Sequence, residues 1–186
     1  MNLDDIKMRL PDYAKDLRLN LDSVLAESGA PGLDARQIAI IALASAIAAR
    51  HEPLTAAIAA RFAATLSDAE ANGARTAAAI MAMNNVYYRF THLVGNEEYA
   101  TMRAGLRMNA MADPGCGKVD FELASLAVSA INGCGKCMES HEKTLQKHGV
   151  PAQAIQSAVR IAAVLHAVAV TAEQAAAATP ALAAAA

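Results

Sequence analysis

The chain has 186 residues and a formal net charge of −2, with 55% hydrophobic, 4% aromatic and 18% charged residues. This length fits one domain, and the nearly balanced charge without tryptophan excludes a nucleic-acid-binding surface. The acidic start, with Asp4 and Asp5, is unlike a signal peptide, and the apolar run at 161–171 is too short to span a membrane. Three cysteines, an odd number, fit a reducing compartment. We expect a cytoplasmic protein with neither nucleic-acid nor membrane partners.

Helical periodicity dominates the chain from end to end. Together with caps and breaks, it predicts helices at 3–10, 11–25, 34–50, 54–66, 67–90, 119–131, 134–147 and 151–173. Asp34 and Ser67 are the expected N-caps of two long helices, and Ser67 begins a capping box. No alternating strand pattern of useful length is present. The fold class is therefore all-α, in one domain at 1–178 with an alanine-rich tail at 179–186.

Two segments of the chain resemble each other at a shift of 84 residues. Ser45-Ala46-Ile47 falls on Ser129-Ala130-Ile131, and the predicted helix breaks coincide as well. The shift predicts two related helical units, at about 34–90 and 118–174. Alanine-rich helices also align without common descent, so the pattern leaves both origins open.

A Cys-x-x-Cys motif with a following histidine carries the chemistry. Cys134 and Cys137 can close and reopen a disulfide, and His141 can move the proton that decides which thiol attacks. At about 100° per residue of a helix, the three side chains lie within about 60° of one another. A helix beginning near Cys134 favours a thiolate at its N-terminus.

Zinc binding is the main alternative for these residues. A structural zinc ion takes four protein ligands, whereas the local candidates are Cys134, Cys137 and His141. Only Cys116 remains as a further thiol, and no second metal-binding motif is present. We expect no metal and no tightly bound cofactor. Inert core cysteines are disfavoured because Gly, Lys and Glu separate them.

Glu122 is the candidate partner of His141. It lies in the helix before the dithiol, and two antiparallel helices joined near Gly133 would bring its carboxylate towards the imidazole. A carboxylate there fixes the tautomer and raises the basicity of the histidine, which can then deprotonate a thiol. The alternative is a solvated acid in a helix first turn.

Segments around the motif and outside it resemble the AhpD family of alkylhydroperoxidases in the carboxymuconolactone decarboxylase-like superfamily. The segments around the motif are Phe121-Glu122-Leu123, Ala127–Cys134, Cys137 and His141–Leu145. The three segments outside it are Leu10–Asp16, Met83–Arg89 and Gly105–Asn109. The motif alone is shared by the superfamily, whereas the outer stretches are similar to AhpD in particular.

The resemblance implies a helical homotrimer with a Cys134–Cys137 redox disulfide. It implies that Cys137 attacks the peroxide, becomes sulfenic acid and forms the mixed disulfide with the peroxiredoxin AhpC. It assigns Cys134 as proton donor and resolving thiol, and Glu122 and His141 as the proton relay. Electrons would come from a lipoyl group on a dihydrolipoamide acyltransferase, itself reduced by dihydrolipoamide dehydrogenase.

The chain departs from some family members at Lys136, where they carry a relay histidine. A lysine stabilises a thiolate by charge but does not shuttle protons near neutral pH.

The roles of the two thiols also stay open on the residues alone: proximity to His141 favours Cys137 as the thiolate, whereas the helix dipole favours Cys134. Alternative functions are a decarboxylase of the carboxymuconolactone type, which has no need of two cysteines, and a non-catalytic adaptor that senses oxidation.

Overall fold

A computed structural model describes residues 1–183, with side chains through residue 177, and this part of the chain is helical without a strand. The all-α prediction is confirmed. The helices are α1 Leu3–Arg9, α2 Lys15–Val24, α3 Ala35–Ala48, α4 Glu52–Arg61, α5 Asp68–Leu93, α6 Glu97–Thr101, α7 Lys118–Ile131, α8 Gly135–Lys147 and α9 Ala152–Ala183. Single turns of 3-10 helix, η1 Asp12–Ala14, η2 Glu27–Gly29 and η3 Asn109–Met111, lie between them.

The two capped helices begin where their N-cap residues predict. Asp34 accepts a hydrogen bond of 2.7 Å from the Gln37 amide, and the Gln37 side chain accepts one from the Asp34 amide. Ser67 and Glu70 form the same reciprocal arrangement at the start of α5. Each box satisfies amide groups that a helix N-terminus otherwise leaves without partners.

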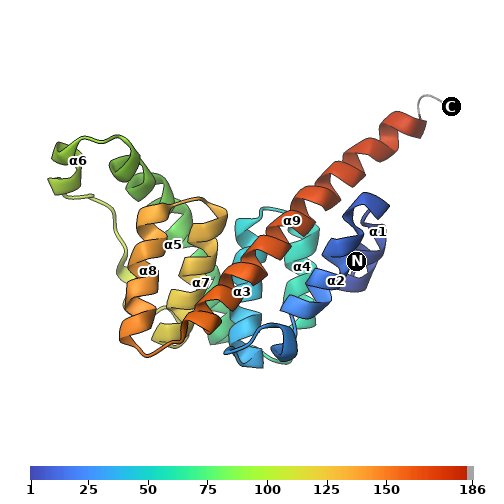
Figure 1. Ribbon diagram of the computed structural model, residues 1–186, viewed down its shortest axis with the longest axis horizontal. Coiled ribbons are helices and arrows are strands. Elements are labelled where there is room, and N and C mark those ends of the chain that lie inside the picture. Colours follow the sequence, from blue (N-terminus) through green and yellow to red (C-terminus); the bar gives the residue numbers. More distant parts are fainter. Residues whose placement is uncertain (184–186) are drawn as a thin grey trace.

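The core is built around α3. Residues 38–46 of this helix are all buried, so it has no solvent face. It packs against α5, α7 and α9, while α7 packs in turn against α8 and α9. Helices α1, α2 and α4 lie on one side of this centre and α5 and α8 on the other, with α9 crossing between them (Figure 1). Such an arrangement explains the alanine content, because small side chains let several helix axes approach one central helix.

Several local predictions differ from the structure. The helix predicted at 11–25 is divided into the 3-10 turn η1 Asp12–Ala14 and helix α2 Lys15–Val24. The helix expected to reach residue 66 ends at Arg61, where Phe62 is the C-cap and a turn follows. Helix α6 and η3 have no predicted counterpart, because elements this short have no measurable periodicity. The last helix continues past Pro180 to Ala183, within a stretch of alanine, the residue with the highest helix propensity. The final three residues of the predicted tail at 179–186 lie outside the described residues.

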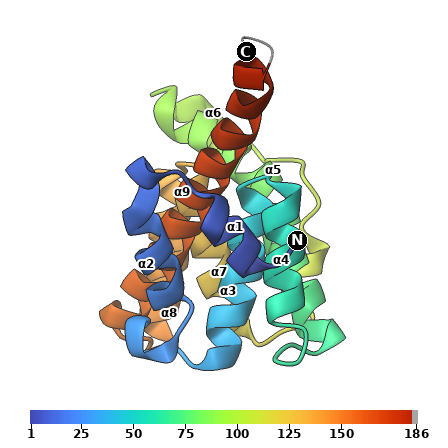
Figure 2. The same ribbon diagram turned by 90° about the vertical axis from the view of Figure 1, so that its right-hand side faces the viewer.

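Helix α6 and the chain around it stand apart from the rest of the molecule, as both views show (Figure 2). Most side chains between residues 92 and 105 are exposed. The end of α5 and this arm carry exposed apolar side chains, namely Phe90, Leu93, Val94, Tyr99 and Met102.

Helix bounds follow the 84-residue shift closely. Shifting the start of α3 by 84 gives residue 119, beside the start of α7 at Lys118. The same shift carries the start of α4 to within one residue of α8, and the start of α5 onto Ala152 of α9. This supports two related units at about 34–90 and 118–174, which stay a prediction.

One helix is long and apolar enough to cross a membrane by length and composition alone, the segment Ala152–Ala177 of α9. Half of its most apolar window is buried against the rest of the protein. That burial is typical of a core helix, as is its packing against α3 and α7.

Candidate functional site

The site forms where α7 turns into α8. Asn132 is the C-cap of α7, and Gly133 follows it in the left-handed region with φ 68°. The Cys134 amide then donates to the Ser129 carbonyl at 3.0 Å, and the Gly133 amide donates to the Ala130 carbonyl at 3.2 Å. This pair of bonds is a Schellman motif, which ends a helix and reverses the chain. It places Cys134 at the beginning of α8, antiparallel to the helix that carries Glu122.

Cys134 and Cys137 are joined by a disulfide, with their Cα atoms 5.3 Å apart. Cys134 is the N-cap of α8, and its sulfur accepts a hydrogen bond of 3.3 Å from the Cys137 amide. The exposed fraction is 0% for Cys134 and 6% for Cys137. Of the two residues, Cys137 is therefore the more accessible from solution.

His141 lies one helical turn after Cys137 and contacts Glu122. The Nδ1 atom of His141 is 2.7 Å from Glu122 Oε2, and their side chains are only 9% and 13% exposed. Glu122 is thus not the solvated acid of the alternative interpretation. With an N–H on Nδ1 donated to the carboxylate, Nε2 is the ring nitrogen that can take up or release a further proton.

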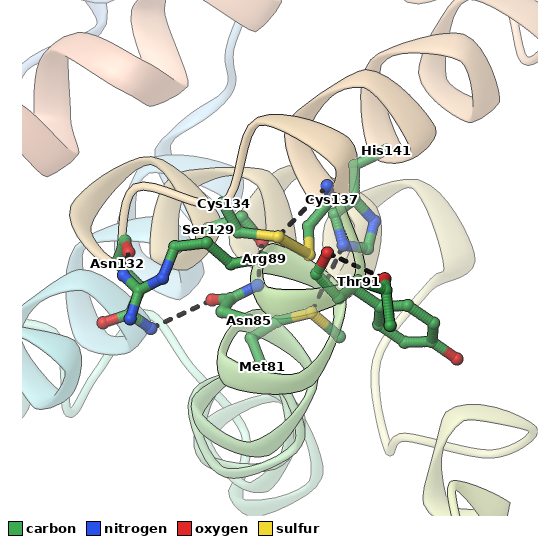
Figure 3. The surroundings of a disulfide bond; sticks show 10 residues. Met81, Asn85, Arg89, Thr91, Ser129, Asn132, Cys134, Cys137 and His141 are labelled. Carbon is green, nitrogen blue, oxygen red and sulfur yellow. Dashed lines mark hydrogen bonds between the residues drawn. A yellow bond between two sulfur atoms is a disulfide. The ribbon is translucent and has the colours of Figure 1, made fainter. Parts of the chain in front are cut away.

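Met81 contacts the other side of the imidazole. Its sulfur is 3.2 Å from His141 Nε2, and the side chain is buried on α5 (Figure 3). A thioether is only a weak hydrogen-bond acceptor, so the Met81 sulfur hardly competes with a thiol or a substrate for a proton carried by His141 Nε2. Its place beside His141 was missed in the sequence, because it depends on how α5 packs against α8.

A cavity of about 240 Å³ opens beside Cys137 and His141. Its apolar wall consists of Met81, Met108 and Met111, of which the last two come from the segment around η3. Other lining residues are Asn84, Tyr88, Lys136 and Ser140. A larger cavity of about 450 Å³ lies between α1, α4 and α9, where no cysteine lines it. The chemistry of the dithiol therefore belongs to the smaller cavity.

Lys136 lies at the cavity with its ammonium group 5.8 Å from the centre of the Tyr88 ring. An ammonium over an aromatic face is stabilised by the ring electrons. Its positive charge next to Cys137 in the chain can stabilise a thiolate. In this place a lysine supplies charge, whereas the buried pair of His141 and Glu122 supplies the group that exchanges protons.

A hydrogen-bonded cluster fixes the α7–α8 turn to α5. The Asn85 side chain donates to Ser129 Oγ at 2.9 Å and accepts from the Asn132 amide group at 2.9 Å (Figure 3). Arg89 donates to the Asn132 carbonyl at 2.5 Å. Asn85 is fully buried. Because the turn precedes Cys134 directly, this cluster sets the position of the disulfide relative to α5.

Cys116 is the third thiol and is not part of the disulfide. Burial, and to a smaller extent the negative charge of Asp120, raises its pKa to about 11. Such a thiol is protonated and unreactive at neutral pH. In the part of the chain that the structure describes, no group of three or more His, Cys, Asp and Glu side chains has a geometry that could hold a metal ion.

Comparison with known proteins gives two kinds of match. A family model described as the carboxymuconolactone decarboxylase family matches residues 97–181, which include α7 and α8. A protein named "Alkyl hydroperoxide reductase AhpD" from Bradyrhizobium sp. (strain BTAi1 / ATCC BAA-1182) is 53% identical over 97% of this chain and 98% of its own length.

Two further relatives with the same name agree with that result. The protein from Rhodopseudomonas palustris (strain BisA53) is 54% identical over 95% of this chain and 96% of its own length. The protein from Streptomyces coelicolor (strain ATCC BAA-471 / A3(2) / M145) is 53% identical over 92% of this chain and 94% of its own length. The likeness therefore extends far beyond the dithiol motif, into the N-terminal helices.

Proposed function

The chain belongs to the AhpD family, and from this premise we propose that it is an antioxidant alkyl hydroperoxide reductase that works through Cys134 and Cys137. The observation that carries the proposal is the buried pair of His141 and Glu122, at 2.7 Å, beside a dithiol that lines a cavity. A structural disulfide needs no base beside it. A dithiol that must be deprotonated in every turnover does.

In the proposed cycle, His141 takes the proton of the Cys137 thiol while Glu122 stabilises the resulting imidazolium. The thiolate attacks the terminal oxygen of the hydroperoxide, so that an S–O bond forms and the O–O bond breaks. Cys137 becomes sulfenic acid, and the departing alkoxide takes the proton from His141 to leave as an alcohol. Cys137 is 6% exposed and lines the cavity, whereas Cys134 is 0% exposed and does not, which supports this assignment of the attacking thiol.

Cys134 then resolves the sulfenic acid. Its thiol attacks the sulfur of Cys137, a disulfide forms and water leaves with the proton from Cys134. The hydrogen bond between Cys134 Sγ and the Cys137 amide supports this step, because it keeps the resolving sulfur at the start of α8. A dihydrolipoyl group would restore both thiols by two successive exchanges, in which it becomes the cyclic disulfide.

The proposal includes partners that the AhpD family implies. The electron donor would be a lipoyl group on a dihydrolipoamide acyltransferase, reduced by dihydrolipoamide dehydrogenase, and Cys137 would also form a mixed disulfide with the peroxiredoxin AhpC to regenerate it. We further propose a cytoplasmic homotrimer. The exposed apolar side chains at the end of α5 and on α6 support association, since patches of this kind mark protein interfaces.

An NADH-coupled assay tests the proposal. Purified protein is combined with dihydrolipoamide dehydrogenase, a lipoylated acyltransferase and cumene hydroperoxide, with and without AhpC. We expect NADH oxidation that requires both the lipoylated donor and Cys137. The Cys116→Ser variant is the matched control and should retain turnover, whereas Cys137→Ser should lose it. Equal turnover by Cys137→Ser would overturn the proposal, as would a wild-type protein that leaves the hydroperoxide intact.

The decarboxylase alternative agrees with the description of the matching family model, but a decarboxylase has no need of the dithiol found in this chain. A decarboxylation of that type uses no redox-active pair, whereas this chain places two bonded cysteines beside a buried base.

Sedimentation tests the trimer separately: a species of about three times the 19.3 kDa chain is expected, and a monomer that is independent of concentration would contradict it.

A further inference from the structure

Asn84 is a buried polar residue whose acceptor has no partner. It is 5% exposed on α5, and in the described part of the chain no hydrogen-bond donor reaches its Oδ1 atom. Among the described residues, four buried side-chain atoms have no hydrogen-bond partner, and they belong to Arg18, Ser45, Asn84 and Ser125. Asn84 is the one of the four that lines the cavity beside Cys137.

The neighbouring residue shows what a structural asparagine does in this helix. Both hydrogen bonds of Asn85 are made within the fold, one to Ser129 and one to Asn132. Asn84 points to a different face, which it shares with Met81 and Tyr88, three and four residues away along the helix. All three side chains line the cavity. An unpaired buried carbonyl costs free energy, so its presence at this wall indicates a ligand that donates a hydrogen bond.

The chemistry of the cavity restricts what that donor can be. The wall formed by Met81, Met108 and Met111 is apolar and flexible, and accommodates a hydrocarbon group of varied shape. An organic hydroperoxide combines such a group with a single O–H donor, carried by the terminal oxygen. That oxygen is also the atom that a thiolate attacks.

We propose that Asn84 Oδ1 accepts a hydrogen bond from the O–H group of the hydroperoxide and thereby holds its terminal oxygen against the sulfur of Cys137. This inference rests on the proposed function and adds a substrate-binding catalytic residue to it. Fixing the O–H direction aligns the O–O bond with the attacking sulfur. The sulfur then loses two electrons to the terminal oxygen, the O–O bond breaks, and the alkoxide receives its proton from His141.

A pre-steady-state experiment separates this role from others. Reduced protein is mixed with cumene hydroperoxide, and the second-order rate of Cys137 oxidation is measured for wild type, Asn84→Ala and Asn84→Leu. We expect both variants to react about tenfold more slowly, the effect of one lost hydrogen bond. Alkylation of Cys137 by iodoacetamide at the same pH, and reduction of the disulfide by dihydrolipoamide, should remain at the wild-type rate. Ser125→Ala, which removes another buried polar atom without a partner but does not line this cavity, is the matched control and should react normally.

Each other outcome overturns the inference in a recognisable way. An unchanged oxidation rate in Asn84→Leu removes the hydrogen bond from the mechanism. A parallel fall in alkylation shows that Asn84 acts on the thiolate or the fold, and a fall only in the dihydrolipoamide step assigns it to the electron donor. If wild-type Cys137 does not react with the hydroperoxide, the proposed function itself fails. Should Asn84→Leu fold poorly, Asn84→Ala supplies the same comparison, and thermal unfolding of both variants verifies their folded state.

Discussion

Arg36 and Asp120 are 84 residues apart in the chain and are joined by an ion pair of 2.6 Å. Their separation equals the shift that relates the two predicted helical units, so the pair joins equivalent positions of α3 and α7. Asp120 is 5% exposed and also accepts from Gln37 at 3.1 Å, while Arg36 contacts Glu70 at 3.2 Å as well. The two central helices are thus linked by charge at the end opposite the α7–α8 turn.

Replacing Arg36 by methionine should destabilise the protein. The variant leaves the buried Asp120 carboxylate with Gln37 as its remaining side-chain donor, and losing a hydrogen bond to a buried charge costs about 2 kcal/mol of the free energy of unfolding. Urea denaturation measures this loss. Lys143→Met is the matched control, because the Lys143–Glu139 pair is exposed and such pairs contribute little. Equal effects of the two substitutions would contradict the prediction.

Replacing His141 or Glu122 by glutamine should slow hydroperoxide reduction by about 10²–10⁴-fold, the range for a lost general base. In His141→Gln, the alkylation of Cys137 should also move to higher pH, because the buried base no longer takes the thiol proton. Lys136→Ala should have the smaller effect, since the lysine contributes charge alone. Mass spectrometry of each cysteine against pH checks this. A shift confined to Cys134 would reverse the roles proposed for the two thiols.

Cys116 should resist alkylation at neutral pH. Its pKa of about 11, against an ordinary value of 9.0, keeps it protonated, because burial and then the charge of Asp120 disfavour the thiolate. Its alkylation rate should still be rising above pH 9. The same shift has a consequence for stability: the contribution of the buried thiol is complete below pH 9.0 and is lost between pH 9.0 and about 11, as the unfolded chain ionises first. Rapid labelling at pH 7 would refute the assignment.

Gly73→Ala should destabilise the protein through a steric clash with the loop that carries Cys116. A Cβ atom at residue 73 would lie 2.5 Å from the Cys116 sulfur and 2.8 Å from its Cβ, so backbone must move to accept it. The melting temperature should fall. Gly135→Ala is the control for stability, because a Cβ there meets nothing within 4 Å and lies within the first turn of α8. Similar melting temperatures for the two variants would contradict this prediction, because they would show that the loop around Cys116 moves aside without loss of stability.

Much of the fold could be predicted because its signals are local. Asp34 and Ser67 begin their helices by bonding to amides three residues away, an interaction that the sequence contains in full. The contact of Glu122 with His141 follows from a hairpin closed at Gly133. The segment around Met108 and Met111 gave no such signal, since a single 3-10 turn has no period and its place depends on packing against α5.

The cavity side of the site was the hardest to predict for the same reason. Asn84 and Asn85 are neighbours of identical chemistry, and the sequence does not distinguish them. Their positions around the helix differ: the Asn85 amide faces the α7–α8 turn and has partners there, whereas Asn84 lines the cavity and its Oδ1 atom has no partner among the described residues. Only the relative placement of α5, α7 and α8 contains that information.

Cys134 is both the N-cap of α8 and a member of the disulfide, so the order of the first turn of α8 depends on the redox state of the dithiol. Cys134 Sγ closes the first turn by accepting from the Cys137 amide at 3.3 Å while it is also bonded to the other sulfur. After reduction the covalent link across this turn is gone, and only the hydrogen bond from the Cys137 amide to the Cys134 thiol, a weak acceptor, remains to close it. The first turn of α8 should therefore loosen when electrons arrive and tighten when a peroxide takes them away. Faster hydrogen exchange of the Cys137 amide in the reduced protein would be the direct sign of it.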